Sequence, residues 1–232
     1  MPASDWERFD GLRDPLDAYH GSVVALGDIR GRNLLDMGCG DGWLSVILAK
    51  RGAHVWGYDI SSSAIETAHQ RAKENSVESV THFEVASAYQ TPYPDKHFDL
   101  VIGQAILHHL GDKGALAREL IRVMRPNAKA VFCEPFAASP LLKAVRRMVP
   151  VRSDAEDDPD QQQMTYKDFD DFRSLFTVEL DEFQLLSRLD RVVKSRSAVR
   201  FLSRVDRRLL RHLRVLRKYA RTVVVTLRPM PG

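Results

Sequence analysis

The chain has 232 residues, of which 44% are hydrophobic and 28% are charged, a composition typical of globular proteins and not of disordered ones. The chain has 34 lysines and arginines and 31 acidic residues, and the resulting net charge of +3 does not by itself indicate a binding partner. Two cysteines exclude a disulfide scaffold, and no apolar run approaches the roughly 18 residues of a membrane-spanning helix. Acidic residues near the start, where a secretory signal is basic and then apolar, predict a cytoplasmic protein.

Apolar runs alternate with amphipathic segments over the first 135 residues. The spacing predicts strands at 33–37, 53–59, 80–85, 98–102 and 128–133, with helices between the first and second, second and third, and fourth and fifth of them. Such alternation predicts an α/β fold with a parallel, doubly wound sheet. Ligands of these sheets bind beyond the carboxyl ends of the strands, where this chain places glycines and acids.

The alternation stops after Pro135. From there we expect, in order, a helix at 136–150, a polar connection at 152–163, a short helix capped by Thr165, a strand at 176–186, a basic helical stretch at 188–218 and a last strand at 222–227.

A glycine-rich loop, Asp36-Met37-Gly38-Cys39-Gly40-Asp41-Gly42, joins the first predicted strand to its helix. Glycines at such a turn let the backbone bend and let a ligand approach closely. A dinucleotide fingerprint would have its third glycine at the position of Trp43. The acid at the strand end disfavours a pyrophosphate and suits a positively charged ligand. Asp59 ends the next strand, where a carboxylate can bind both hydroxyls of a ribose.

Together with FDLVIGQAILHHL at 98–110 and RVMRPNAKAVFCEPF at 122–136, these residues resemble the class I S-adenosylmethionine-dependent methyltransferases. The resemblance implies a Rossmann-like, seven-stranded, mostly parallel sheet with an antiparallel last strand, and S-adenosyl-L-methionine as cofactor. It implies a single domain over 1–232, with a cofactor-binding core at 30–136, a helical addition at the N-terminus and helical decoration at 137–220 that covers the acceptor site. The tail resembles bacterial members that modify small molecules, which predicts a small-molecule acceptor.

The resemblance also implies which residues hold the cofactor. Asp36 would hold the ammonium of the methionine part above the glycine loop, and Asp59 would bind the ribose diol with Ile60 beside the adenine. Where the family commonly has an Asp that bonds the adenine amine, this chain has Ser87, a weaker acceptor. The expected cofactor-binding residues are Asp36, Gly38, Cys39, Gly40, Asp59, Ile60, Ser87, Ala88, Gly103 and Gln104.

Two histidines and a glutamate follow the fourth and fifth predicted strands, where the acceptor would lie. Histidine titrates near neutral pH and can take a proton from a hydroxyl. We therefore expect O-methylation with His109, or its neighbour His108, as the base, and only one of the two facing the site. The opposing interpretation is that a histidine here only packs. Glu134 can orient a histidine, bind an amine or cap a helix.

Aromatic residues in the flanking segments suggest the walls of an acceptor site, which we expect to include Tyr19, His20 and Tyr166. No cluster of His, Cys and Asp has a metal-ligand spacing, so no metal is expected. Three alternatives stay open. They are N-, S- or C-methylation by positioning alone, a nucleic-acid methyltransferase, and a non-enzymatic cofactor-binding protein.

The segment 188–221 holds thirteen arginines or lysines and two aspartates. We expect an apolar face of Leu202, Val205, Leu209, Leu213 and Leu216. This can be an ordinary surface helix, or it can dock an acidic partner such as an anionic lipid, a carrier protein or a phosphorylated substrate. Nucleic acid is not the expected partner, because the D/N-P-P-Y motif of base-amine methyltransferases is absent after the fourth strand.

Overall fold

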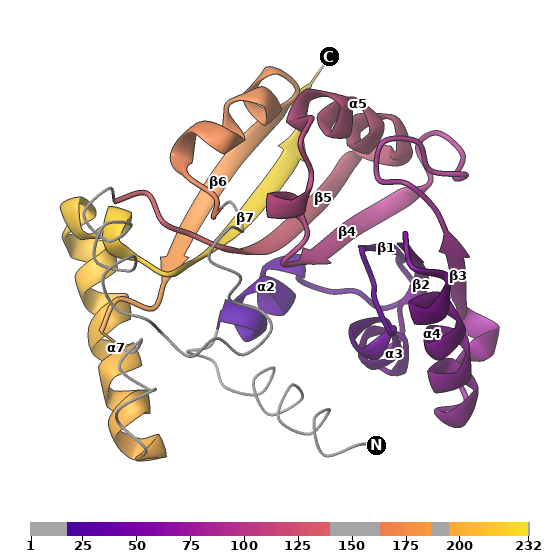
Figure 1. The fold of residues 1–232 in the computed structure, drawn as a ribbon, viewed down its shortest axis with the longest axis horizontal. Coiled ribbons are helices and arrows are strands. Elements are labelled where there is room, and N and C mark those ends of the chain that lie inside the picture. The colour runs from indigo at the N-terminus through magenta and orange to yellow at the C-terminus, as the bar shows by residue number, and fades with distance from the viewer. Residues whose placement is uncertain (1–17, 140–162, 187–194, 232) are drawn as a thin grey trace.

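The computed structural model describes residues 18–139, 163–186 and 195–231. Its strands form a seven-stranded sheet in the order β3-β2-β1-β4-β5-β7-β6 (Figure 1). Neighbouring strands from β3 to β5 are parallel, whereas β7 runs antiparallel to both β5 and β6. The strands are β1 (Asn33–Met37), β2 (His54–Asp59), β3 (Thr81–Val85), β4 (Phe98–Gln104), β5 (Met124–Pro135), β6 (Phe176–Phe183) and β7 (Thr222–Pro229).

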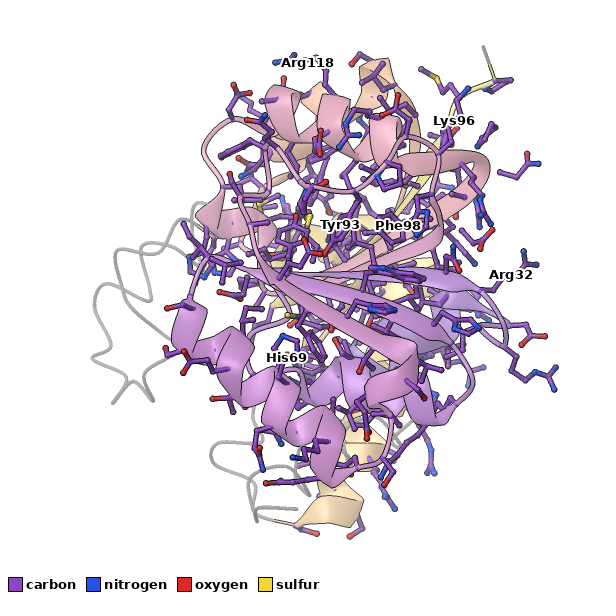
Figure 2. The ribbon with its side chains drawn as sticks, turned by 90° about the vertical axis from the view of Figure 1, so that its right-hand side faces the viewer. Arg32, His69, Tyr93, Lys96, Phe98 and Arg118 are labelled. Carbon is purple, nitrogen blue, oxygen red and sulfur yellow. The ribbon has the colours of Figure 1, made fainter. Side chains whose placement is uncertain are left out.

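Helices cover both faces of the sheet, so the central strands are buried on both sides. Figure 2 shows His69 on α4 and Arg118 on α5 on opposite sides of the sheet. Short 3-10 helices join several elements. The helices are α2 (Ala18–Leu26), α3 (Trp43–Lys50), α4 (Ser62–Glu74), α5 (Lys113–Val123) and α7 (Arg196–His212), and the 3-10 helices are η1 (Glu78–Val80), η2 (Leu107–His109), η3 (Tyr166–Phe169), η4 (Asp171–Ser174) and η6 (Arg214–Tyr219).

Side chains with short polar ends begin α4 and α5. The Ser61 hydroxyl accepts a hydrogen bond from the Ala64 amide, and the Asp112 carboxylate accepts one from Ala115. Each bond satisfies one of the backbone donors that a helix start leaves without a partner. Thr165 begins η3 with a reciprocal capping box, which confirms its predicted capping role.

The segment after β5 differs from the sequence prediction. Residues 136–139 are not helical, because the Phe136 amide donates to Arg221 and the Ala137 amide donates to Met164. The predicted helix is therefore wrong over these four residues, and its remainder falls outside the described part of the chain. Most of the polar connection at 152–163 also falls outside it. The predicted fifth strand is confirmed but begins earlier, at Met124, which pairs with Phe98 across a register shift.

The basic segment is helical but not continuous. α7 ends at His212, where Leu213 turns the chain into η6. The prediction of one apolar face through Leu213 is wrong, because that side chain is 48% exposed. Among the described side chains of α7, Leu210 and Asp206 are the buried ones. The charge of Asp206 is tolerated there because its carboxylate accepts the amides of Leu185 and Leu186, just after β6. The predicted helical residues 188–194 lie outside the described residues.

Candidate active site

The glycine loop lies at the carboxyl end of β1, at the start of α3, and three of its glycines have positive φ. A Cβ added to Gly38 would lie 2.7 Å from the side chain of Ile106, and one added to Gly42 would lie 2.7 Å from Ala68. A side chain at Gly38 would have to displace Ile106, and one at Gly42 would press on the Cβ and backbone of Ala68. A Cβ on Gly40 would meet nothing within 4 Å. Gly40 thus presents bare backbone to an open space, as a site for a closely approaching ligand requires.

Asp59 ties the glycine loop to the end of β2. One of its carboxylate oxygens accepts the Gly40 amide at 3.0 Å and the other accepts the Ser61 amide at 2.9 Å. Each oxygen retains a second lone pair, so the carboxylate can still accept hydroxyl groups. Ile60 follows with 84% of its surface exposed, which leaves an apolar face beside the carboxylate.

The expected adenine-side residues reach the same end of the sheet. The Ala86 amide donates to the carbonyl of Asp59, which brings Ser87 and Ala88 to this edge. The Ser87 hydroxyl accepts the Tyr89 amide at 3.3 Å. Ala88 is buried and Ser87 is exposed.

Asp36 lies buried at the root of the loop. Its carboxylate accepts the Ser45 hydroxyl at 2.5 Å. Burial raises the pKa of Asp36 to about 7, and the negative charge of Asp59 adds to the rise while Ser45 opposes it. A cation beside this group would restore its ionised form. Cys39, also buried, donates its amide to the Tyr58 carbonyl, and burial raises the pKa of its thiol, so the thiol is not activated as a nucleophile.

Gln104, the last residue of β4, carries an unsatisfied buried acceptor. The Ser22 hydroxyl of α2 donates to the Tyr19 carbonyl, so it accepts a hydrogen bond from the Gln104 amide nitrogen at 2.8 Å. That arrangement fixes the orientation of the amide group. Its oxygen Oε1 is buried without a hydrogen-bond partner in the described structure. An orphaned buried acceptor is costly and fits a site where a ligand supplies the donor. Ser22 was not foreseen from the sequence, since a serine within a helix carries no distinguishing pattern.

Glu134, fully buried at the end of β5, holds the loop that follows β4. Its Oε1 accepts the amides of Ile106 and Leu107 at 2.9 and 2.8 Å. Its Oε2 lies 2.8 Å from Nδ1 of His108. The same loop contains Ala105 at φ 53°, a left-handed conformation that costs an alanine about 1–2 kcal/mol. Glu134 therefore fixes Ile106 against Gly38 and fixes the ring of His108.

The two histidines differ in surroundings. The His108 ring is buried beside Glu134, while His109 is exposed, and the two ring centroids lie 3.9 Å apart. They belong to the 3-10 helix η2, whose Leu107 carbonyl accepts the Lys113 ammonium at 2.5 Å. Partial desolvation lowers the pKa of His109 below its usual 6.5, and the neighbouring His108 and Lys113 add to the lowering while Glu134 opposes it. His109 is therefore neutral at pH 7 and able to accept a proton.

The expected wall residues lie on two sides. Tyr166 packs its ring edge-on against Phe136, with centroids 4.9 Å apart, and its hydroxyl donates to Glu182 on β6 at 3.1 Å. Tyr19 and His20 lie on α2, which packs against β5, β7 and β4. Burial raises the pKa of Tyr166, so it stays protonated.

Across the residues that the structure describes, no three His, Cys, Asp or Glu side chains are grouped to hold a metal ion. Nor does any helix in the described ranges have the length and apolar character to cross a bilayer.

The donor and acceptor set fits S-adenosylmethionine. The bare backbone at Gly40 admits the cofactor's approach, and the unsatisfied Gln104 oxygen and the Asp36 carboxylate suit its ammonium. Asp59 suits the ribose hydroxyls and exposed Ile60 the adenine ring.

Comparison with known proteins agrees with this fit. Residues 35–132 match the methyltransferase domain family. Over 100 residues the chain is 38% identical to 27-O-demethylrifamycin SV methyltransferase of Amycolatopsis mediterranei, an alignment that covers 43% of this chain and 37% of that protein. It is 33% identical over 107 residues to the ubiquinone biosynthesis O-methyltransferase of Alkalilimnicola ehrlichii, with 46% and 43% covered. The aligned parts thus span less than half of these relatives.

The fold has solved counterparts. The crystal structure of geranyl diphosphate C-methyltransferase from Streptomyces coelicolor, in complex with Mg²⁺, geranyl diphosphate and S-adenosyl-L-homocysteine, superposes with a TM-score of 0.65. That superposition covers 91% of this chain and 79% of that one at 13% sequence identity, so the likeness is one of fold. Residues 35–132 thus match a methyltransferase domain, and the seven-stranded sheet has the fold of the class I S-adenosylmethionine-dependent methyltransferases, whose methyl donor is S-adenosylmethionine.

Proposed function

We propose that this protein transfers the methyl group of S-adenosylmethionine to a hydroxyl of a small molecule, with His109 as the base. The observation that carries the proposal is the contrast between the two histidines after β4. His108 is buried and bound to Glu134, whereas His109 is exposed and has a lowered pKa. A neutral, accessible imidazole beside the methyl donor is what deprotonation of a hydroxyl needs.

The chain's own residues first bind and orient the cofactor. S-adenosylmethionine supplies an electrophilic methyl group on a sulfonium. Gln104 and Asp36 hold the ammonium and Asp59 holds the ribose, with Ile60 beside the adenine. Gly38, Cys39 and Gly40 form the loop beneath the methionine part, Gly103 lies at the end of β4, and Ser87 and Ala88 lie on the adenine side.

The acceptor is then held in line with the methyl group, because orientation supplies much of the rate of a direct displacement. Glu134 and His108 act as positioning residues, since Glu134 fixes the loop that carries both histidines. His109 takes the hydroxyl proton as the oxygen attacks. Tyr19, His20 and Tyr166 form walls of the acceptor site. Of the expected cover at 137–220, residues 137–139, 163–186 and 195–220 are described and complete this side, and the remainder lies outside the described residues.

Three other functions are compatible with the same fold. A nitrogen, sulfur or carbon acceptor needs less help from a base, so orientation alone would be the mechanism there. A nucleic-acid acceptor would use the basic helix α7, and a protein that binds the cofactor without turnover would lack any acceptor. The pairing of a neutral exposed histidine with a buried one favours the hydroxyl acceptor.

The first test is transfer of a labelled methyl group to a panel of phenols, alcohols, amines and thiols. We expect phenols or alcohols to be methylated, and turnover of amines and thiols alone would contradict the hydroxyl acceptor. Binding of S-adenosylhomocysteine, measured by calorimetry, tests the cofactor site separately.

The second test replaces each histidine. His109→Ala should lower kcat by about 10²–10⁴-fold, the usual contribution of a general base, with cofactor affinity unchanged. Raising the pH should partly restore the rate, since a phenol of pKa about 10 then ionises without help. His108→Ala is the matched variant, and we expect it to lower kcat without the rescue at high pH. Wild-type rates at neutral pH in His109→Ala would rule out the histidine base.

A further inference from the structure

A buried lysine binds the turn that carries the two histidines. Lys113, the first residue of α5, is only 9% exposed, although lysine is among the residues that are least often buried. Its ammonium group donates hydrogen bonds to the carbonyls of Leu107 and Leu110. These two residues lie immediately before and after the pair His108 and His109. Lys113 therefore binds the backbone on both sides of the histidine pair.

The short helix η2 is held at both ends by side chains of opposite charge. At its start, the Glu134 carboxylate accepts the amides of Ile106 and Leu107. At its end, the Lys113 ammonium donates to carbonyls. A 3-10 helix of three residues makes few hydrogen bonds of its own, so the backbone groups at its ends need other partners. One side chain from β5 and one from α5 thus determine where the histidines lie.

The surroundings of Lys113 compensate for the burial of its charge. Burial lowers the pKa of Lys113 below its usual 10.5, and the carboxylates of Asp168, Glu134 and Asp171 oppose this lowering. A desolvated ammonium group is costly unless it is hydrogen-bonded, and the two carbonyls of the histidine turn provide those bonds. The buried cation is therefore tied to this turn and not to the surface.

The same lysine lies close to the segment that carries the proposed acceptor wall. α5 packs against η4, and η4 packs against η3. Asp168 of η3 and Asp171 of η4 both act electrostatically on Lys113. Asp168 also accepts the amide and the hydroxyl of Thr165, the residue before Tyr166. Lys113 thus lies where the turn of the histidines meets the turn of Tyr166.

We propose that Lys113 is a positioning residue of the methyl transfer, whose ammonium group fixes the turn that presents His109 to the acceptor. The inference rests on the proposed function, because it takes His109 as the base. Lys113 acts through the backbone of the turn and through its charge, and it touches neither the cofactor nor the acceptor in this role. The contribution of a positioning residue is made to kcat, since orientation governs the rate of a direct displacement.

The charge of Lys113 gives this role a signature that a structural side chain would lack. Desolvation lowers the pKa of His109, His108 of η2 and Lys113 of α5 lower it further, and Glu134 of β5 raises it. Removing the charge of Lys113 should therefore raise the pKa of His109 toward its usual 6.5. A base with a higher pKa becomes protonated at a higher pH, so the acidic fall in rate should begin at a higher pH.

The first measurement is the titration of the His109 ring in the full chain, followed by nuclear magnetic resonance. The signal is identified by its loss in His109→Ala. We expect Lys113→Met, which keeps a flexible side chain and removes the charge, to raise the pKa of His109. Lys113→Arg keeps a cation with several donors and should leave the pKa close to that of the wild type. Lys113→Gln is neutral but can still donate to a carbonyl, so it repeats the test with a smaller loss of stability.

Lys129→Met is the matched control. The Lys129 ammonium also donates to a backbone carbonyl, that of Ala25, and burial also lowers its pKa. Lys129 pairs with Leu100 of β4, four residues and about 13 Å before the end of that strand. Both methionine variants should lose stability, but only Lys113→Met should change the titration of His109. An unchanged pKa of His109 in both neutral variants of Lys113, or an equal rise in Lys129→Met, would overturn the proposal.

The second measurement is the pH dependence of kcat with a hydroxylated acceptor. Lys113→Met should lower kcat by up to about a hundredfold, the cost of misplacing a reacting group by about 1 Å. KM for S-adenosylmethionine should stay constant, and Lys113→Arg should restore most of the rate. A wild-type kcat in Lys113→Met would overturn the positioning role even if the titration shifts. Wild-type turnover by His109→Ala would instead refute the histidine base, which separates a failure of the proposed function from a failure of this inference.

Discussion

The two halves of the sheet are built from different kinds of contact. Around β1, β2 and β4 the site is made by backbone groups, such as the Gly40 amide on Asp59 and the bare backbone of the glycine loop. Around β5, β6 and α7 it is made by long side chains, with Glu134 spanning to the loop after β4 and Arg217 reaching Glu182. Backbone geometry leaves few choices of residue, whereas long side chains reach the same place from many positions. The half that we propose to bind the cofactor, called the cofactor half below, is therefore fixed by short motifs. The half that we propose to bind the acceptor, the acceptor half, has more freedom in its residues.

The largest expected effect comes from the junction between the halves. Glu134→Ala removes the acceptor of the Ile106 and Leu107 amides and leaves the His108 ring without its partner. Removing one partner of a buried charged network costs about 3–5 kcal/mol, which urea unfolding will measure. Glu134→Gln keeps one acceptor oxygen and should lose markedly less. An unchanged unfolding free energy in Glu134→Ala would show that the loop is held by other contacts.

Within the cofactor half, Asp59→Ala should weaken S-adenosylhomocysteine binding. The variant removes the anchor of the Gly40 amide and the proposed ribose contacts, a loss on the order of 2 kcal/mol, or about thirtyfold in affinity. Calorimetry measures it, and Asp95→Ala, an exposed carboxylate paired with Arg122, is the control. Wild-type affinity in Asp59→Ala would remove this residue from the cofactor site.

Asp36 should make the cofactor half sensitive to pH. Its pKa is raised to about 7 in the folded protein from 3.8, so the folded state binds more protons than the unfolded state between these values. Stability from this group is thus complete below pH 4 and falls as pH rises toward 7, by at most about 1.4 kcal/mol per pH unit. Asp36→Asn should remove that slope in urea unfolding and also weaken cofactor binding above pH 7. A slope that is the same in the variant would contradict the assignment.

A smaller difference in stability is expected between two glycine variants of the same loop. In Gly40→Ala the added Cβ meets no atom within 4 Å, so the only cost is that of an alanine in the left-handed backbone conformation, about 1–2 kcal/mol. Gly38→Ala has a similar φ and in addition a contact of 2.7 Å with Ile106, so it should be the less stable variant. Thermal unfolding compares the two, while calorimetry should find cofactor affinity lowered in Gly40→Ala. Equal stabilities would mean that Ile106 moves aside.

The smallest effect is expected on the outer surface of the acceptor half. Phe201 of α7 is 62% exposed, so Phe201→Ser should change the unfolding free energy by less than about 0.5 kcal/mol. Leu210→Ala, on the buried side of the same helix, should cost about 2–5 kcal/mol. Similar losses in both variants would show that the exposed face is also packed.

The sequence predicted the elements that local contacts determine better than those that depend on distant parts of the chain. Strands β1 to β4 and the parallel, doubly wound arrangement of the sheet were predicted, because apolar runs and glycine turns act over a few residues. The extended path at 136–139 was not, because its backbone hydrogen bonds go to Met164 and Arg221, far along the chain. Helical periodicity reflects only the spacing of apolar residues within one segment, so it gives no information about hydrogen-bond partners far along the chain.

In the candidate site, the sequence placed the acids and glycines at the correct strand ends but not the contacts between side chains. That Glu134 binds His108 and not His109 depends on the 3-10 turn of η2, which apolar spacing does not reveal. The link between Ser22 and Gln104 joins residues 82 positions apart. Only the folded chain shows that one oxygen of Gln104 is left over for a ligand.

Because Val223 of β7 pairs with Glu134 of β5 and with Glu182 of β6, the spacing of the strands sets the distance between the backbones of the two glutamates. The distance across the three strands comes from backbone hydrogen bonds, so no exchange of side chains in β7 will stretch it. The separation of these two glutamates changes only with a slip of register, which proceeds in steps of two residues, about 7 Å, if each side chain is to keep its face. Insertions between β5 and β7, and not gradual substitution, would therefore be needed to alter it.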